Sequence, residues 1–402
     1  MYDTIVVGAR CAGSPTAMLL ARKGYRVLLV DKATFPSDSM STHYIHQPGV
    51  AHLARWGLLE HVVATNCPPI SKVLLDLGPF ALTGSPPGAD GLAEAYCPRR
   101  TVLDAILVDA AVAAGAELRE GFTVQEVLMD GQRVIGIRGR TQGGSSVTEY
   151  ARMVIGADGL HSRVARAVQA PTSSEKPTFN CAYYTYWSGV PIEDVEWYPR
   201  DHRMVIGFPT NDGLVCIAVE WPRAEFHAFR ANIEENYLKT LELAPDLAER
   251  VRAGKREERF VGTADLPNFF RKPFGPGWAL VGDAGYHKDP ITGEGITDAF
   301  RDADLLAEAL HRGWSGRCEL EEALADYEQQ RNETAMPIYE LTCQLSSLEP
   351  PAPEMQQLFS ALRGNQEQTN RFFGTIAGTV PIPEFFSPQN IERIMAAVSR
   401  QG

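Results

Sequence analysis

The chain lacks the features that mark nucleic-acid-binding and membrane-spanning proteins. Its 402 residues include 38 Lys and Arg against 50 Asp and Glu, a net charge of −12, and the basic residues form no run. This balance disfavours a nucleic acid or an anionic membrane surface as the main partner. No apolar stretch approaches the ~18 residues needed to cross a bilayer, so we expect no integral membrane segment.

The seven cysteines lack any regular spacing. They form no C-x-x-C pair, and no His lies at zinc-ligand spacing from them. We therefore predict no metal site and expect reduced thiols, as in a reducing compartment. The N-terminus also lacks the basic stretch and cleavage site of a secretory leader. These absences predict a cytoplasmic globular protein, long enough for two domains or one large discontinuous domain.

One further absence falls within a motif. The stretch Val-Val-Gly8-Ala-Arg10-Cys-Ala-Gly13 matches the dinucleotide fingerprint G-x-G-x-x-G, except that Arg10 stands in place of the second glycine. Hydrophobic patterning predicts a β-α-β unit around this loop, which ends at Asp31. Its predicted elements are Thr4–Val7, Ala12–Lys23 and Arg26–Val30.

Each part of this unit has a role in binding a dinucleotide. Gly8 permits the tight turn, and Gly13 lets the helix approach the strand. The helix N-terminus presents N–H groups and partial positive charge to a phosphate. Asp31 lies 23 positions after Gly8, where a carboxylate accepts hydrogen bonds from ribose hydroxyls. The alternative is an ordinary β-α-β turn without a ligand, but strand, loop, helix and terminal acid together favour the nucleotide site.

Two more predicted strands end near a glycine–aspartate pair. The sequences are Val154-Ile-Gly-Ala-Asp158-Gly159 and Leu280-Val-Gly282-Asp283, the second continuing to Pro290-Ile-Thr-Gly293-Glu-Gly295 and a predicted helix. Each pair alone is a weak signal, because Asp-Gly is common in turns. Three such signals in this order, over about residues 1–345, resemble the FAD-dependent aromatic hydroxylase superfamily. This superfamily is p-hydroxybenzoate hydroxylase-like and also contains geranylgeranyl reductases and flavin halogenases.

The resemblance implies FAD as the cofactor and gives each motif a role. The first loop binds the FAD pyrophosphate, the pair Asp158-Gly159 supports that region, and Asp283 binds the ribityl hydroxyls. The helix that begins near Gly295 aims its N-terminus at the flavin N1–C2=O edge, where reduced flavin carries negative charge. Arg100 contacts the cofactor phosphates, although adjacent Arg99 leaves that assignment open by one position. The predicted cofactor-binding residues are Gly8, Arg10, Cys11, Ala12, Gly13, Asp31, Lys32, Arg100, Asp158, Gly159, Gly282, Asp283, Pro290, Gly293, Gly295 and Ile296.

The Arg10 side chain has two possible orientations in such a site. It either leans away from the pyrophosphate or curls over the phosphates as a charged lid, and we favour the lid. This hypothesis predicts that Arg10→Gly weakens FAD retention in a salt-sensitive way.

The composition changes near residue 178. The segment 179–220 is rich in Tyr, Trp, Val and Phe and has a turn signal at 211–213, which predicts an antiparallel sheet, and residues after 320 read mainly as helix. With the resemblance, this predicts a mixed α/β (α+β) fold: a Rossmann-like FAD-binding domain, an inserted antiparallel-sheet substrate domain and a C-terminal helical segment. The predicted boundaries are 1–71, 98–177 and 258–345 for the FAD-binding domain, 72–97 and 178–257 for the substrate-binding domain, and 346–402 for the C-terminal segment.

The resemblance leaves several reactions open. In a monooxygenase, NADH or NADPH reduces FAD, O₂ adds at flavin C4a, and the hydroperoxide transfers oxygen to a hydrophobic, planar or polycyclic small molecule. The alternative is an FAD-dependent reductase of a prenyl chain or another alkene. A flavin halogenase is disfavoured because the W-x-W-x-I-P signature is absent, and a non-catalytic flavin-binding protein because the 290–295 loop serves the reacting ring. We favour the monooxygenase as the commonest chemistry of this architecture.

Departures from the family pattern concern the substrate side. The prenyl reductases carry Y-x-W-x-F-P, which here reads Met204-x-Ile206-x-Phe208-Pro209, so both aromatic residues are absent. Ala165 stands in an arginine position of the Asp-Gly motif, and the sequence after Asp283 is Ala-Gly-Tyr-His instead of Ala-Ala-His. These changes leave FAD binding in place and put the pyridine-nucleotide and active-site geometry in doubt.

Candidate substrate contacts come from the aromatic sheet: Tyr184, Tyr186, Trp187, Met204 and Phe208. Alternate residues of a strand share a face, so Tyr184 and Tyr186 point one way and Trp187 the other. His43 and His287 are the candidate catalytic bases. No second fingerprint exists for NADH or NADPH, so this donor is expected to bind transiently across the FAD face. The expected oligomeric state is a monomer or a homodimer.

Overall fold

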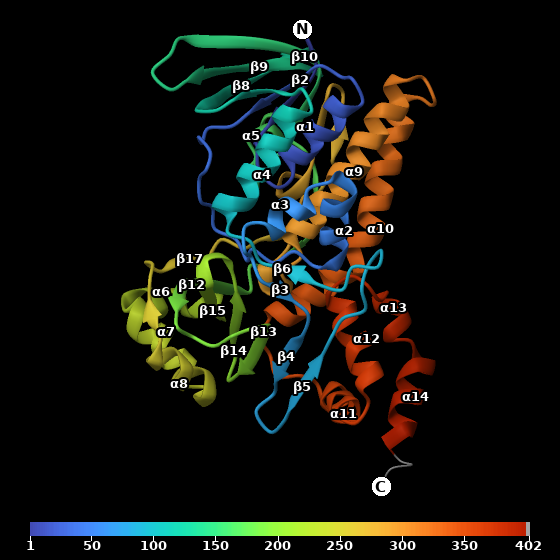
Figure 1. Ribbon diagram of the computed structural model, residues 1–402. Coiled ribbons are helices and arrows are strands. Elements are labelled where there is room, and N and C mark those ends of the chain that lie inside the picture. The colour runs from blue at the N-terminus through green and yellow to red at the C-terminus, as the bar shows by residue number, and fades with distance from the viewer. Residues whose placement is uncertain (399–402) are drawn as a thin grey trace.

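A mainly parallel sheet forms the upper part of the molecule in the computed structural model, which describes residues 1–398 (Figure 1). Its strands follow the order β19-β20-β10-β1-β2-β7, and the antiparallel hairpin β8–β9 continues from β10. The bounds are β1 Tyr2–Val7, β2 Val27–Val30, β7 Glu117–Arg119, β8 Phe122–Asp130, β9 Arg133–Thr141, β10 Ser146–Gly156, β19 Phe274–Gly275 and β20 Trp278–Leu280.

Both faces of this sheet are buried, which explains why its central strands are continuous apolar runs. In β1, Val6 packs against the helices on one face, while Ile5 and Val7 pack against the β8–β9 side. The helices of the first face include α1 Gly13–Arg22, α2 Gln47–Trp56, α3 Leu59–Val63, α4 Arg100–Ala113 and α9 Gly295–Trp314, with α10 Leu320–Ser346 packed on α9. The short helix α5 Arg163–Ala167 follows β10 on the other face.

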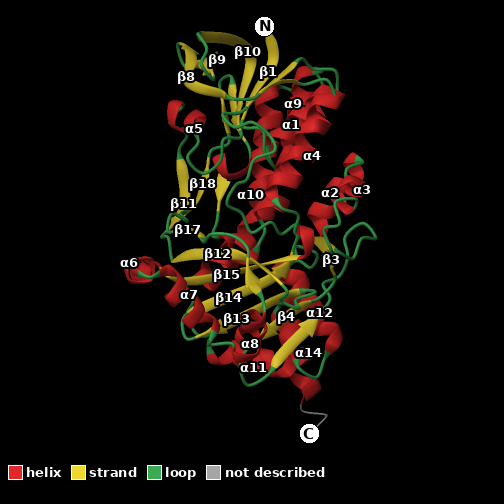
Figure 2. Ribbon diagram, turned by 60° about the vertical axis from the view of Figure 1, so that its left-hand side comes forward, coloured by secondary structure: helices red, strands yellow, loops and turns green. Residues whose placement is uncertain are grey.

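A second sheet lies below the first (Figure 2). Its order is β16-β12-β15-β14-β13-β4-β5, with β17 also paired to β12. Segment 73–84 thus adds two strands to a sheet built mainly from residues 180–263. The bounds are β4 Val73–Asp76, β5 Ala81–Gly84, β12 Asn180–Ser188, β13 Val195–Arg200, β14 Arg203–Pro209, β15 Leu214–Pro222, β16 Lys255–Arg256 and β17 Val261–Thr263.

The two faces of the second sheet are covered by different helices. One face packs against α6 Phe226–Ala231, α7 Ile233–Leu241 and α8 Pro245–Ala253, and the other lies toward the C-terminal helices. These are α11 Pro353–Leu362, α12 Gln366–Ile376, α13 Ile382–Phe385 and α14 Pro388–Val398. Helix α12 approaches β5 closely, since a Cβ at Gly84 would lie 2.8 Å from the Phe373 ring.

Small elements connect the two sheets. They comprise the pair β3 Pro69–Ile70 with β6 Ala95–Tyr96, the three-stranded sheet of β11 Thr172–Lys176, β18 Asn268–Arg271 and β21 Tyr286–His287, and the 3₁₀ turns η3 Gly282–Ala284 and η4 Pro290–Thr292. The predicted mixed α/β fold, with a Rossmann-like part, an antiparallel sheet and C-terminal helices, is confirmed. Among residues 1–398, none of the helices combines the length and apolarity that crossing a bilayer requires.

Candidate active site

The carboxyl ends of four parallel strands meet at one edge of the upper sheet. The register pairs Val7 of β1 with Val30 of β2 and with Gly156 of β10, and Gly156 with Leu280 of β20. The loops after these strands therefore begin side by side, although they are far apart in the sequence. Such an edge is where open α/β sheets bind ligands. The loops carry four of the predicted residues: Gly8, Asp31, Asp158 and Asp283.

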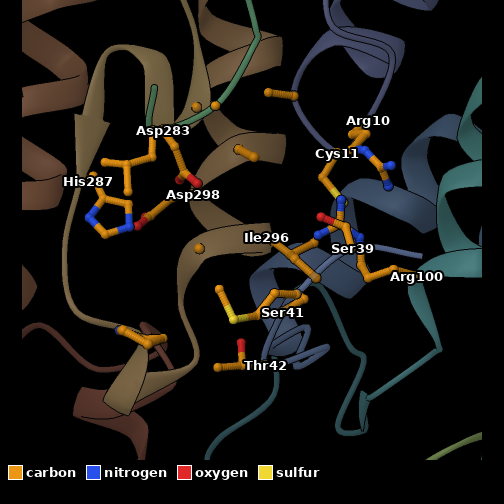
Figure 3. Close-up of a pocket in the computed structure, with 18 of the residues that line it drawn as sticks. Arg10, Cys11, Ser39, Ser41, Thr42, Arg100, Asp283, His287, Ile296 and Asp298 are labelled. Carbon is orange, nitrogen blue, oxygen red and sulfur yellow. The ribbon is translucent and has the colours of Figure 1, made fainter. Parts of the chain in front are cut away.

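A cavity of about 900 Å³ starts at this edge and reaches the second sheet. Small-molecule sites commonly measure ~300–1,000 Å³, so this one is large. Every predicted cofactor-binding residue except Gly13 lines it. Figure 3 shows Arg10 and Arg100 on one side of the pocket and Asp283 and His287 on the other.

Two glycines set the shape of the first loop. Gly8 has φ +104°, and a Cβ there would lie 2.3 Å from the carbonyl oxygen of Ala157. A Cβ at Gly13 would lie 1.8 Å from the carbonyl oxygen of Gly8. The loop and the start of α1 therefore pack too closely for a side chain at position 13, so glycine is required there. No side chain caps α1. The Ser14 N–H donates to the Arg10 carbonyl oxygen over 3.0 Å, and Pro15 has no N–H, which leaves the Gly13 N–H at the start of this helix for an anion.

The buried Asp104 of α4 joins Arg10 to Arg100. Arg10 Nη1 donates to Asp104 Oδ2 over 2.5 Å, and Arg100 donates to both Asp104 oxygens over 2.9 and 3.0 Å. Arg10 also donates to Ser37 Oγ over 2.9 Å. Arg10, which stands in place of the second glycine, therefore links α4 to the loop after β2 through hydrogen bonds at the cavity wall. Cys11 lies against the same carboxylate, and burial raises the pKa of its thiol, so it stays protonated.

The three predicted cofactor carboxylates differ in their freedom to bind a ligand. Both oxygens of Asp31 already accept a backbone N–H, over 2.7 and 2.8 Å. Asp158 Oδ2 accepts the N–H groups of Arg163 and Val164 at the start of α5, over 2.6 and 3.3 Å, while its Oδ1 has no partner within the described part of the chain. Asp283 is exposed to the cavity. Asp283 therefore has the most free acceptor positions.

The N-terminus of α9 faces the middle of the cavity. Gly295 and Ile296 line it, and no side chain caps the helix. A Cβ at Gly295 would meet no atom within 4 Å, so the space in front of the helix is open. Free N–H groups and the helix dipole make this a suitable place for negative charge.

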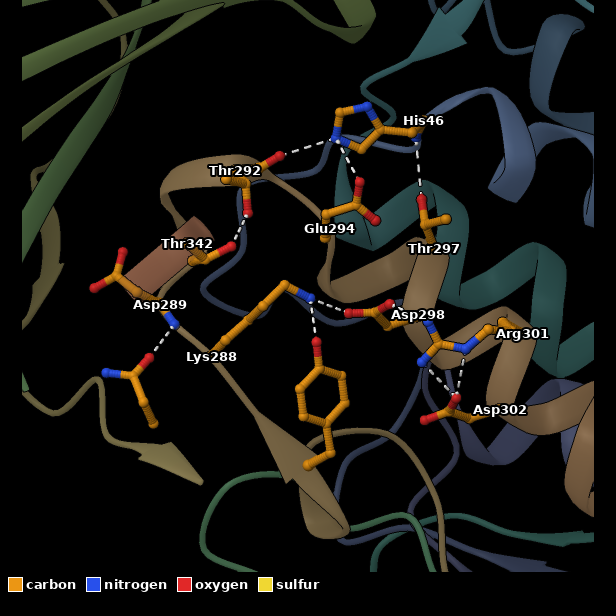
Figure 4. A network of polar contacts seen from close by, with 12 residues as sticks. His46, Lys288, Asp289, Thr292, Glu294, Thr297, Asp298, Arg301, Asp302 and Thr342 are labelled. Carbon is orange, nitrogen blue, oxygen red and sulfur yellow. Dashed lines mark hydrogen bonds and ion pairs between the residues drawn. The ribbon is translucent and has the colours of Figure 1, made fainter. Parts of the chain in front are cut away.

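A buried network of charges lies behind this helix end (Figure 4). Lys288 binds Asp298 and the Tyr286 hydroxyl, and Arg301 donates to Asp298 over 2.6 Å. Burial works against ionisation of Asp298, but Lys288 and Arg301 outweigh it and lower the pKa of Asp298. Burial raises the pKa of Glu294 to about 8, which keeps this carboxyl mostly neutral at pH 7. The helix end therefore keeps its positive potential.

The lower end of the cavity is an apolar chamber. We define it by Tyr184, Trp197, Ile206 and Phe208 of the second sheet and Phe373 and Ile376 of α12. Sheet and helix come from segments that are far apart in the sequence, and both are needed to enclose the space. A chamber of this kind fits a hydrophobic small molecule.

The structure divides the predicted substrate residues between two faces. Tyr184 and Phe208 line the chamber, whereas Tyr186 and Met204 belong to the same apolar cluster without lining it. Trp187 lies on the opposite face, where its indole donates to the Tyr237 hydroxyl over 3.2 Å. The expectation that Trp187 contacts substrate is corrected, because strand alternation directs it toward α7.

The two candidate bases occupy different surroundings. His43 is fully buried outside the cavity lining, and its Nε2 contacts the Tyr186 hydroxyl. Burial, together with Arg100 and Arg99, lowers the pKa of His43 to about 3, so the ring is neutral. His287 lines the cavity, and its Nδ1 lies 2.5 Å from the Pro267 carbonyl oxygen. A carbonyl oxygen accepts, so Nδ1 is the donor and Nε2 is left as the acceptor. The base role is a prediction for both residues, and His287 has the better geometry for it.

Sequence reasoning missed several residues of the cavity. Glu220 and Asp289 are buried acids at its wall, Lys288 is a buried base, and α12 supplies part of the chamber. The Lys288-Asp289 pair directly precedes the predicted Pro290 loop, so its position was a usable signal. Glu220 and α12 had none, because only tertiary packing brings them to the cavity.

The fold places dinucleotide-binding loops at one end of a cavity and an apolar chamber at the other. The profile of the family described as "FAD binding domain" matches residues 1–342, and the chain belongs to this family. It is therefore an FAD-dependent oxidoreductase, and the glycine cradle, the free helix N-termini and Asp283 fit that cofactor.

Three known proteins are similar to the chain in sequence or in fold. The chain is 29% identical over 312 residues to digeranylgeranylglycerophospholipid reductase 2 of Methanopyrus kandleri, covering 73% of each chain. It is similar in fold to the myxobacterial chondrochloren halogenase CndH, with a TM-score of 0.79, 21% identity and coverage of 98% and 96%. It is also similar to PqsL, a probable FAD-dependent monooxygenase from Pseudomonas aeruginosa, with a TM-score of 0.73, 22% identity and coverage of 93% and 99%.

Proposed function

We propose that the protein is a monooxygenase that uses NADH or NADPH and O₂ to oxygenate a hydrophobic small molecule. The observation that carries this proposal is the single cavity that joins the FAD-binding loops to the apolar chamber. Substrate in the chamber would lie next to the end of α9, where the reactive ring of FAD is expected. FAD, when bound, supplies the electron transfer and the activation of O₂.

In the proposed reaction, the residues of this chain hold the cofactor, orient the substrate and exclude water. The first loop, Arg100 and Asp283 hold the cofactor, and the N-terminus of α9 stabilises negative charge on it. Phe373 and Ile376 of α12 cover the chamber and keep water away from the reaction. His287 is the base with access to the cavity. NADH or NADPH binds transiently across the face of the bound FAD.

The second candidate is reduction of an alkene, as in a prenyl reductase. It is favoured by the 29% identity to the archaeal reductase, which exceeds the identity to the two solved structures. Against it stands the substrate sheet, which carries Met204 and Ile206 where the prenyl reductases have aromatic residues.

One experiment separates these functions. The FAD-loaded protein is reduced anaerobically with NADH or with NADPH, and then exposed to ¹⁸O₂ together with candidate aromatic substrates or prenyl alkenes. A monooxygenase consumes O₂ and gives a product with one ¹⁸O atom. A product that gains two hydrogens without O₂ consumption would replace the proposal by the reductase function.

A further inference from the structure

Two acidic side chains lie near each other at the wall of the cavity, where the loop that leads to Pro290 approaches the second sheet. Glu220 lies on β15, and Asp289 lies in the loop between β21 and η4. Both line the cavity, and they are only 3% and 1% exposed. Asn180, the first residue of β12, lies beside them and donates from Nδ2 to Glu220 Oε2 over 3.1 Å. Three segments therefore build one polar cluster, with Glu220 and Asp289 in the cavity lining and Asn180 buried next to it.

This cluster has more acceptors than donors, since the Asn180 amide is the side-chain donor recorded for it within residues 1–398. Asp289 Oδ1 accepts the N–H of Ile291 over 3.0 Å, but Asp289 Oδ2 is buried and has no partner within residues 1–398. Asn180 Oδ1 is likewise buried without a partner there. Glu220 binds Asn180 through Oε2, which leaves its Oε1 as a third acceptor. Buried acceptors are normally paired, so the two buried free ones, Asp289 Oδ2 and Asn180 Oδ1, indicate a missing group.

Within residues 1–398, neither Glu220 nor Asp289 is hydrogen-bonded to or ion-paired with a Lys or Arg side chain. Lys288, the neighbouring base, is bound to Asp298 and to the Tyr286 hydroxyl. Figure 4 shows the Asp289 carboxylate pointing to the opposite side from that contact. Burial raises the pKa of Asp289 to about 7, and burial and Asp289 raise the pKa of Glu220 well above its usual range. Two carboxyls in a poorly solvated wall are therefore left without a cation.

We propose that Glu220, Asp289 and Asn180 form the polar end of the substrate site and bind a protonated primary amine on an otherwise apolar substrate. This proposal rests on the proposed function, since it assumes that a small molecule occupies the chamber. An ammonium group offers three donors and one positive charge, which matches three free acceptors and two acids. A hydroxyl offers a single donor and no charge, and a carboxylate would bring a further acid to two acids that already lack a cation.

The test uses the full-length, FAD-loaded protein and three ligands of nearly equal shape: 4-phenylbutylamine, 4-phenylbutan-1-ol and 4-phenylbutyrate. Affinities are measured by calorimetry at pH 8. The amine is expected to bind at least about tenfold more tightly than the alcohol, and the carboxylate most weakly. Equal affinities of amine and alcohol, including no measurable binding of either, would overturn the proposal. So would tightest binding of the carboxylate.

Variants locate the effect. Glu220→Gln and Asp289→Asn keep the size of each side chain and should each weaken the amine about tenfold while changing the alcohol by less than about twofold. The matched control is Glu257→Gln, because Glu257 binds Ser188 and Lys255 and does not line the cavity. FAD content and melting temperature confirm that each variant is folded. If a folded variant lost affinity for the amine and for the alcohol to the same extent, Glu220 and Asp289 would not be the residues that bind the ammonium group.

This result is independent of the reaction type. Incorporation of ¹⁸O into neutral substrates without a preference for amines would keep the proposed function and remove this inference. Amine preference in a protein that only reduces alkenes would keep the inference and remove the monooxygenase.

Discussion

At the scale of single residues, Asp104 is the point where the variant fingerprint is stabilised. Its carboxylate is fully buried and accepts from Arg10, Arg100 and the Cys11 thiol. Arg10 keeps 25% of its side chain exposed, whereas Arg100 is 10% exposed. The two arginines therefore differ in what they contribute, although both line the cavity.

We expect Arg100→Ala to weaken FAD binding more than Arg10→Ala. A partly exposed ion pair contributes ~0.2–1 kcal/mol, which is about a fivefold loss or less for Arg10. A buried, charged hydrogen-bond partner contributes ~1.5–3 kcal/mol, or more than about tenfold for Arg100. FAD release is measured by flavin fluorescence after dilution, at low and high salt. A loss for Arg10→Ala that is larger, and salt-sensitive, would support the charged lid instead.

A second prediction concerns the two faces of β12 and β14. Trp187→Ala should lower the free energy of unfolding by about 3–5 kcal/mol, since the indole packs against α7. It should leave the KM for substrate unchanged, and Trp187→Phe should do the same at a smaller loss of stability. Phe208→Ala should change KM, because Phe208 lines the chamber. Urea unfolding and steady-state kinetics measure both. A KM change at position 187 as large as that at 208 would contradict the assignment of faces.

At the scale of elements, helix α9 is the element on which the cofactor site depends. Its first residues face the cavity, and its first turn carries Asp298, held between Lys288 and Arg301. Glu294 immediately precedes the helix, and its carboxyl lies 3.7 Å from His46. Burial lowers the pKa of His46 to about 4, so that ring is neutral near pH 7. The helix N-terminus is thus kept free of an unpaired negative charge.

This arrangement predicts a defined pH dependence. The pKa of Glu294 is about 8 in the folded chain, above its ordinary value of 4.5. Between these values the unfolded chain releases a proton that the folded chain keeps, so Glu294 lowers stability as pH rises. Glu294→Gln removes this effect. The melting temperature of the FAD-loaded variant should therefore exceed that of the parent by an amount that grows from pH 5 to pH 8. The corresponding difference in the free energy of unfolding grows by up to about 1.4 kcal/mol per pH unit.

Two outcomes would contradict this prediction. A difference in melting temperature that stays constant from pH 5 to pH 8 would mean that Glu294 is ionised throughout. A variant less stable than the parent at pH 8 would mean that the carboxylate is paired. Because His46 is neutral over this range, it does not produce the same trend.

At the scale of the whole molecule, the C-terminal helices complete a chamber that the sheet begins. Residues Phe373 and Ile376 of α12 face Tyr184 and Phe208 of the second sheet across the cavity. The cofactor loops lie at the other end of the same cavity. Changes in α12 should therefore affect the substrate without affecting FAD.

We expect substitutions of Ile376 to shift substrate size in opposite directions. Ile376→Phe should narrow the chamber and favour smaller substrates, whereas Ile376→Ala should enlarge it and favour bulkier ones, at a stability cost of about 2–5 kcal/mol. FAD content should stay at the parent level in both. Substrate-stimulated oxidation of NADH or NADPH, measured over a series of aromatic ligands, checks this prediction. A parallel loss for all ligands, with loss of FAD, would mean that α12 supports the fold alone.

The sequence determined the β-α-β unit, the order of the glycine–aspartate loops and the FAD family. The β-α-β unit depends on local physics, namely apolar runs and a glycine with φ +104° at Gly8. The FAD family follows from the resemblance of the three loops to a known superfamily. Register then aligns the carboxyl ends of parallel strands, which explains why residues predicted separately line one cavity. The alternating strand pattern also predicted two faces, but it did not say which face meets the cavity.

Only the tertiary structure decided the partners of buried charges and the shape of the chamber. Arg10 contacts Asp104, 94 positions away, and the pattern of the loop alone does not contain that contact. Glu220, Asp289 and Asn180 meet because a strand pairing and a loop bring them together, and a single acid in a strand gives no periodic signal. Burial and ionisation depend on all neighbours at once, and these come from the whole chain.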